Sequence, residues 1–266
     1  MRRLRRLVQK RALRWSEGVC VIEGPDLVEA ALAAHAHFEA LYVDVDALAR
    51  PVVAALVAGA SDEGVRVLAL AGATFERVAD AATPQGVMAS VHLPVVEVAS
   101  VASDGLVIVA HDLRDPGNAG TIIRSAEAAG ARGVVFTGQS VDPCNPKALR
   151  ASAGAIFQIP VAVGELDAVL EHFAGQGALT WATVLDSERD VRDVDLSGAN
   201  VVVIGSEAEG LDAAAIGACA GTFRIAMAGA SESLNAGVAA SLVAFRAMWQ
   251  REDAKGAAPR PSLGGS

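Results

Sequence analysis

The chain has 266 residues, of which 52% are hydrophobic, and a formal net charge of −9. This length allows one large domain or two modest domains with true cores, and the composition is typical of a packed globular protein rather than a disordered one. No apolar run reaches the about 20 residues that a membrane helix needs, and no signal-peptide core follows the start, so we expect a cytoplasmic protein. The cysteines Cys20, Cys144 and Cys219 stand apart, without the spacing of a metal site, so we expect reduced structural thiols and no metal.

Residues 1–95 predict a small α/β sandwich, in which short strands alternate with helices. Its opening segment is strongly basic, which fits either a solvated helix face or an arm that contacts nucleic acid. Gly24-Pro25-Asp26 begins a helix that ends near residue 34, with the proline in its first turn. The other expected elements are strands over 19–22, 40–43, 65–70 and 87–91, a helix that follows the second strand and ends near residue 57, a short helix near 75–79 and a turn at Thr83-Pro84-Gln85-Gly86.

A linker is expected over 93–104, where Pro94 and small polar residues interrupt the pattern. A second domain over 105–250 begins with a continuous apolar run at 106–110, typical of a parallel strand buried on both faces. The remaining expected elements are strands over 133–136, 178–184, 201–204 and 223–225, and helices near 117–130, 147–153, 165–174 and 233–249. This alternation predicts a mostly parallel sheet with helices on both faces, followed by a disordered tail over 251–266.

Three short segments of the second domain are the most informative. They read NAGTIIR (118–124), GSEAEGL (205–211) and IAMAGASESLN (225–235). Each joins an apolar run to a glycine-rich loop, where backbone can approach a ligand and side chains can be aimed. Taken singly, Asn118 suits a helix N-cap and Arg124 a surface cation.

The third segment leads into an apolar helix. Leu234, Val238, Leu242 and Phe245 recur at helical spacing, and small residues form the neighbouring face. We therefore expect this helix to be buried nearly all round.

In this order, the three segments resemble the signature motifs of the SpoU family of RNA ribose methyltransferases, within the SPOUT class. Thr137-Gly138 and residues 145–155 resemble the family's intervening loop and helix, while Glu23-Gly24-Pro25 and the turn at 83–86 resemble its small RNA-binding domain. The resemblance covers nearly the whole chain except its last residues. Two departures, Ala226 where the family usually has proline and Ala236 where it often has valine, affect loop stiffness and packing rather than reacting groups.

The resemblance implies a fold, a cofactor and a site. The fold would be α/β, with a small N-terminal RNA-binding sandwich and a C-terminal, mostly parallel SPOUT domain that contains a trefoil knot and forms a homodimer. The cofactor would be S-adenosylmethionine. The matching catalytic positions are Arg124, Asn118, Glu207 and Asn235. The matching cofactor-binding positions are Thr137, Gly138, Gly205, Glu207, Gly210, Ile225, Met227, Ser233, Leu234 and Asn235. The basic residues assigned to RNA are Arg2, Arg3, Arg5, Arg6, Lys10, Arg11 and Arg14.

The implied reaction is 2′-O-methylation of a ribose in structured RNA, with 23S ribosomal RNA favoured by the full accessory domain and the basic segment. Because a guanidinium stays charged, we expect Arg124 to orient the hydroxyl and stabilise the developing alkoxide rather than to act as a literal base. A transfer RNA ribose methyltransferase and a catalytically silent RNA-binding protein of the same fold are the alternatives. A Rossmann enzyme lacks support because 115–120 is not GxGxxG, and a serine hydrolase because 229–233 is not GxSxG.

Overall fold

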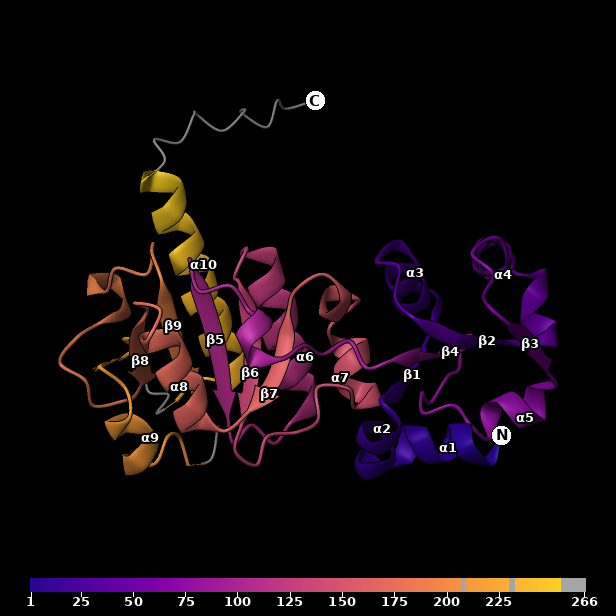
Figure 1. Ribbon diagram of the computed structural model, residues 1–266, viewed down its shortest axis with the longest axis horizontal. Coiled ribbons are helices and arrows are strands. Elements are labelled where there is room, and N and C mark those ends of the chain that lie inside the picture. Colours follow the sequence, from indigo (N-terminus) through magenta and orange to yellow (C-terminus); the bar gives the residue numbers. More distant parts are fainter. Residues whose placement is uncertain (207–208, 230–232, 255–266) are drawn as a thin grey trace.

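A computed structural model describes residues 1–206, 209–229 and 233–254. Two sheets lie side by side along the long axis of the molecule (Figure 1). Glu207, part of the third segment (230–232) and residues 255–266 of the tail expected over 251–266 lie outside the described residues. Within that described part of the chain, no helix combines the length and the apolar character needed to cross a membrane.

The N-terminal half forms a four-stranded sheet of order β1-β4-β2-β3. Its strands are β1 (Val19–Glu23), β2 (Phe38–Asp44), β3 (Val67–Leu70) and β4 (Val87–His92). Strand β4 pairs antiparallel with both β1 and β2, whereas β2 and β3 are parallel. Helices α3 (Pro25–Ala33) and α4 (Pro51–Asp62) cover one face, and α1 (Arg2–Gln9), α2 (Arg11–Glu17) and α5 (Gly72–Glu76) the other (Figure 1).

The basic opening segment is therefore not an extended arm. Helix α1 places Leu4, Leu7 and Val8 in the core against β1, β2 and β4, while its arginines face outward. A helix with apolar residues three and four positions apart buries that stripe and leaves the opposite face in water. The segment is a structural layer of the N-terminal sheet that also carries positive charge.

The C-terminal half forms a six-stranded sheet in which all neighbouring strands are parallel, with the order β10-β8-β9-β5-β6-β7. The strands are β5 (Leu106–His111), β6 (Gly133–Thr137), β7 (Val161–Gly164), β8 (Leu179–Thr183), β9 (Asn200–Ile204) and β10 (Gly221–Phe223). Helices α6 (Pro116–Ala128), α7 (Pro146–Ala151) and α10 (Ala236–Ala254) pack on one face, and α8 (Leu166–Ala174) and α9 (Ala213–Gly217) on the other. The expected parallel α/β architecture is confirmed.

Several element boundaries differ from the sequence-based expectation. Strand β10 and helix α5 begin earlier than expected, and β7 and α9 were not expected, because both are short and carry weak periodic patterns. Helix α10 begins at Ala236 and continues to Ala254, so residues 251–254 are helical rather than part of a tail. Arg251 helps to anchor this end, because its guanidinium donates to the carbonyl of Ala129, 2.6 Å away.

Helix α10 is buried on one face only, contrary to expectation. Its small residues, among them Ala240 and Ala244, are completely buried against α6 and the sheet. Val238, Leu242 and Trp249, on the opposite side, are 47%, 43% and 45% exposed. Small residues let two helices approach closely, so the contact with α6 uses the alanine face and leaves the larger apolar side chains uncovered.

The two halves share one core. A single hydrophobic cluster contains Cys20 and Ile22 of β1 together with Ile108 of β5 and Leu149 of α7. A buried ion pair also ties them: the Arg14 guanidinium lies 2.6 Å from the Asp142 carboxylate, and each side chain is 3% exposed. The indole of Trp15 donates to the other oxygen of Asp142, at 3.2 Å. The N-terminal helices are thus fixed to the loop that follows β6.

Candidate functional site

The motif segments meet at one edge of the C-terminal sheet. Strands β9, β5 and β6 are neighbours and run parallel, so the loops that follow them emerge side by side. The carboxyl edge of an open parallel sheet is where ligands bind in such folds. We call the described residues of the loops at 111–118, 137–140 and 205–210 and of the segment at 224–235 the motif edge.

The first motif begins with a helix cap that the sequence interpretation assigned to the wrong residue. Asp115, not Asn118, is the N-cap of α6, and its carboxylate accepts the backbone N–H of Asn118 at 2.9 Å. Pro116 occupies the first helical position, where a missing N–H costs nothing. The hydrogen bond from Asn118 and the Lys147 ammonium at 3.4 Å hold the pKa of Asp115 below its usual range.

Because Asp115 provides the cap, the Asn118 side chain is available to the third motif. Its carbonyl oxygen accepts a hydrogen bond from the Asn235 side-chain amide at 2.9 Å. Asn235 in turn accepts the Val238 N–H through its own carbonyl oxygen, at 3.2 Å, at the start of α10. The structure therefore joins two predicted site residues that are 117 positions apart.

Arg124 is exposed on α6, six residues beyond Asn118 or about 9 Å along the helix axis. Within the described part of the chain it makes no hydrogen bond or ion pair, in contrast to the neighbouring Ser125, whose hydroxyl lies 2.7 Å from that of Ser241 on α10. Arg124 is not brought into contact with the Asn118–Asn235 pair. Its charge is exposed to solvent.

The loop after β9 is a tight backbone turn. Ser206 and Gly210 form an antiparallel bridge, and Gly210 has a positive φ of 68°. A Cβ atom on Gly205 would lie 2.4 Å from the carbonyl carbon of Gly210, so only glycine lets these two segments touch. The close backbone approach of Gly205 and Gly210 suits a site that holds an adenosine between backbone groups. Glu207 belongs to this loop but lies outside the described residues.

The loop before α10 combines half-buried apolar residues with exposed polar ones. Ile225, Met227 and Leu234 are half-buried, and Ser233 is exposed. Ile225 packs against the main hydrophobic cluster, which anchors the loop where it leaves β10. These residues have the mixed character expected around a cofactor with apolar and polar parts.

Thr137 has an internal partner. Its side chain is buried, and its hydroxyl lies 2.9 Å from Nδ1 of His111 at the end of β5. Gly138 has a φ of 63°, and a Cβ there would lie 2.4 Å from the Asp112 carboxylate, which accepts the N–H of Gln139. The Thr137 hydroxyl thus links the ends of the paired strands β5 and β6. The backbone at Gly138 is then the part of this loop that could contact a cofactor.

The seven basic residues of the opening segment fall into different environments. Arg14 is buried and bonded to Asp142, so its guanidinium is not available to an RNA phosphate. Arg3 pairs with Glu17 and Glu39 and holds the pKa of Glu39 below its usual range. Arg11 donates to the Ser140 carbonyl. The residues that face solvent without an ion pair in the described part of the chain are Arg2, Arg5, Arg6 and Lys10.

Sequence reasoning gave no site role to Asp115 and Lys147 and did not pair Arg150 with Glu23. The cap was detectable, because an acidic residue directly before a proline is a common helix start. Arg150 and Glu23 lie 3.7 Å apart but belong to different halves of the chain, and no local pattern links them.

The fold and the motif edge together define an α/β methyltransferase of the SPOUT class, and comparison with known proteins agrees. The family model described as SpoU rRNA Methylase matches residues 105–245, and that described as MRM3-like substrate binding domain matches residues 1–89. The chain belongs to the SpoU rRNA methylase family.

Curated relatives span most of the chain. An uncharacterized tRNA/rRNA methyltransferase of Synechocystis is 31% identical, over 94% of this chain and 91% of that protein. The 23S rRNA (guanosine(2553)-2'-O)-methyltransferase RlmP of Bacillus subtilis is 30% identical, over 69% of this chain and 73% of its own length. The crystal structure of the SpoU methyltransferase AviRb from Streptomyces viridochromogenes with its cofactor AdoMet superimposes with a TM-score of 0.86 and 26% identity, covering 94% of this chain and 97% of that one.

Proposed function

We propose that the protein transfers the methyl group of S-adenosylmethionine to the 2′-hydroxyl of a ribose in ribosomal RNA, with 23S rRNA as the favoured substrate. The observation that carries the proposal is the hydrogen bond between Asn118 and Asn235, which joins the first and third motifs. The second motif follows β9, the strand next to β5. The names of relatives support both the proposed substrate and the proposed cofactor, since RlmP is a 23S rRNA 2′-O-methyltransferase and AviRb binds AdoMet.

Residues of the motif edge would hold the cofactor. Gly205 and Gly210 would offer backbone groups to the adenosine, and Ile225, Met227 and Leu234 would cover its apolar parts, with Gly138, Ser233 and Asn235 alongside. When bound, S-adenosylmethionine supplies a methyl group activated by a positive sulfonium. The protein's part is then to hold the ribose in line and exclude water, and positioning of this kind can lower a barrier by about 7–11 kcal/mol.

Arg124 would meet the RNA. Its guanidinium, which has no ion-pair partner among the described residues, would orient the ribose hydroxyl and stabilise negative charge as the hydroxyl loses its proton. Glu207, although outside the described residues, remains a candidate for orienting the RNA or bracing its loop. The exposed residues Arg2, Arg5, Arg6 and Lys10 would contact phosphates elsewhere on the substrate.

We also propose that two copies of the chain pair through α10. Val238, Leu242 and Trp249 form an exposed apolar face along α10, and burying it against a second copy would remove this surface from water. The expected measurement is a dimer mass in sedimentation equilibrium that Leu242→Glu converts to a monomer mass. A wild-type monomer at micromolar concentration would refute the pairing. The trefoil knot expected from the resemblance stays a prediction, as does action in the cytoplasm.

The experiment that tests the main proposal is transfer of labelled methyl from S-adenosylmethionine to total rRNA and total tRNA, followed by mapping of the modified ribose. We expect incorporation into 23S rRNA. Incorporation into tRNA alone would overturn the choice of substrate, and none into either pool would leave the silent RNA-binding alternative in its place.

A further inference from the structure

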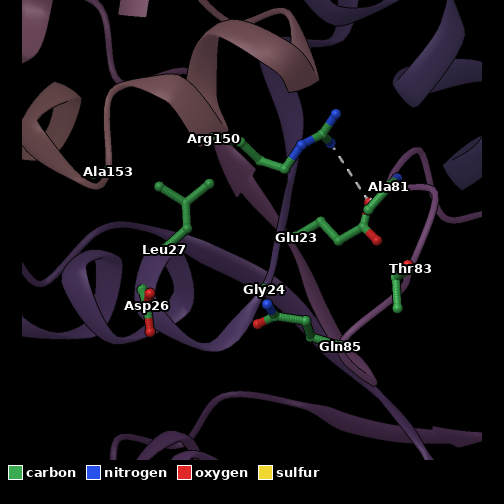
Figure 2. A pocket seen from close by; sticks show the side chains of 9 residues that line it. All are labelled: Glu23, Gly24, Asp26, Leu27, Ala81, Thr83, Gln85, Arg150 and Ala153. Atoms are coloured by element: carbon green, nitrogen blue, oxygen red, sulfur yellow. Dashed lines mark hydrogen bonds and ion pairs between the residues drawn. The ribbon is translucent and has the colours of Figure 1, made fainter. Parts of the chain in front are cut away.

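A small hollow lies at the junction of the two halves, between the N-terminal sheet and α7 (Figure 2). It has a volume of about 230 Å³, and its polar lining comes from Glu23, Gly24, Asp26, Thr83, Gln85 and Arg150. This volume is below the about 300–1,000 Å³ of typical small-molecule pockets, so it suits one planar ring rather than a whole cofactor. None of these residues belongs to the three motif segments.

Glu23 gives the hollow an unsatisfied acceptor. Its side chain is only 6% exposed. One carboxylate oxygen, Oε2, accepts the backbone N–H groups of Asp80 at 2.9 Å and Ala81 at 3.1 Å. The other, Oε1, is buried and has no hydrogen-bond partner among the described residues. Buried acceptors of this kind are rare and costly in folded proteins, so Oε1 calls for a donor from outside the chain.

Arg150 gives the hollow an unsatisfied donor. The side chain reaches from α7 towards Glu23, as Figure 2 shows. Its Nη2 lies 2.6 Å from Asp80, which fixes the guanidinium plane. Its Nη1 lies 3.7 Å from Oε2 of Glu23, too far for a hydrogen bond, and has no hydrogen-bond partner among the described residues. An unmet donor thus stands beside an unmet acceptor.

The charge of the hollow decides between possible ligands. Glu23 and Asp26 line it with two carboxylates against the single guanidinium of Arg150. A phosphate would meet net repulsion there, whereas an uncharged group that carries N–H donors would be attracted. Cytosine and adenine place an amino group next to a ring nitrogen acceptor, and carboxylates accept from such amino groups in nucleic-acid complexes. Uracil places a carbonyl oxygen where cytosine has its amino group, and that oxygen would face Oε1.

We propose that this hollow is a subsite for one unstacked cytosine or adenine base of the RNA substrate, with its amino group donating to Glu23 Oε1 and its ring nitrogen accepting from Arg150 Nη1. The subsite rests on the proposed function, because RNA is the source of the base. Helix α7 connects it to the motif edge: Lys147, one turn before Arg150, approaches Asp115 of the first motif. A nucleotide held here would anchor the strand beside the reacting ribose.

The test uses the full chain and two fluorescent probes of about six nucleotides, oligocytidylate and oligouridylate, in low salt. Fluorescence anisotropy should show oligocytidylate bound at least about fivefold more tightly by the wild type. In Glu23→Gln the amide oxygen can keep the contacts to Asp80 and Ala81, while an N–H donor replaces Oε1. The preference should therefore disappear or shift to oligouridylate. Glu63→Gln, which removes an exposed carboxylate that does not line the hollow, should keep it.

Equal affinity of the wild type for both probes, or an unchanged preference in Glu23→Gln, would overturn the subsite. If Glu23→Gln lacks the wild-type circular dichroism and melting transition, Arg150→Met asks the same question, because it keeps the stem and removes the donor. A loss of preference in Arg150→Met supports the subsite, and a full preference refutes it. Methyl transfer measured on the same preparations separates the two proposals: transfer without base preference refutes the subsite alone, and preference without transfer refutes the proposed function alone.

Discussion

The motif edge and the basic opening segment both stand out in the sequence, yet they relate to the structure in opposite ways. At the motif edge, the glycine-rich segments lie where the sequence predicts: they form loops at strand ends, and their glycines allow close backbone contacts. In the opening segment, residues that look alike have separate tasks, since Arg14 is buried, Arg3 is paired and Arg5 faces solvent.

The difference lies in where the physical cause resides. A glycine turn after a buried strand depends on a few adjacent residues, so the local sequence is enough to predict it. The environment of an arginine depends on what packs against it, and for Arg14 that is Asp142, 128 positions away. Charge composition therefore identifies a basic segment, but it does not show which of its residues stabilise the fold and which are exposed for binding.

The largest effect should come from breaking the buried ion pair. Arg14→Ala leaves the Asp142 carboxylate buried without its partner, so we expect a loss of about 3–5 kcal/mol in the free energy of unfolding. Arg3→Ala, in the same segment but exposed, should cost below about 1 kcal/mol. Urea denaturation of the two variants measures the contrast. Similar losses would show that burial does not separate these arginines.

The next effect concerns the motif edge. Arg124→Ala should lower the rate of methyl transfer by about 10²–10³, the range for losing one electrostatic contact to a transition state. Because Arg124 is exposed and makes no hydrogen bond or ion pair among the described residues, stability and S-adenosylmethionine binding should stay at wild-type values. Single-turnover transfer and equilibrium dialysis test the two parts. Activity that survives the substitution would remove Arg124 from the mechanism.

A smaller effect is expected from the solvent-facing cations. Replacing Arg2, Arg5, Arg6 and Lys10 by glutamine should weaken RNA binding and lower the slope of log K against log salt by up to about 3. Deleting the segment is a poor test, because Leu4, Leu7 and Val8 would leave the core with it. Arg66→Gln, which removes a single exposed cation outside the opening segment, is the control. An unaltered slope in the fourfold variant would show that the segment does not contact RNA.

The smallest effect is at the α6 cap. Asp115→Ala should cost about 1 kcal/mol, whereas Asp115→Asn keeps the acceptor and should cost less. The pKa of Asp115 is lowered in the folded state, so its charge contributes stability above the ordinary aspartate pKa of about 4, and this contribution disappears as the pH falls through the lower folded value. Denaturation at pH 7 and at pH 3 measures this. The difference in the free energy of unfolding between the wild type and Asp115→Ala should be smaller at pH 3. A constant gap would contradict a role for the charge.

Much of the C-terminal architecture was predictable, because buried parallel strands leave an unmistakable apolar run, as at 106–110. The position of Asn118 at a helix start was also predictable, but its partner was not. Its bond to Asn235 depends on how α10 returns to pack on α6. The uncovered face of α10 was misjudged, since Leu242 fits a buried stripe by spacing alone, and only the packing of Ala240 and Ala244 shows which face turns inward.

The sequence by itself determined the family, the order of elements and the identity of the motif residues, since these depend on local patterns of glycine, polar and apolar residues. The tertiary structure alone decided which arginine is buried, which asparagines meet, and that Glu23 and Arg150 face each other across a hollow between the halves. Those pairings join residues more than 100 positions apart. Their energies come from burial and geometry, which arise only when the whole chain has packed.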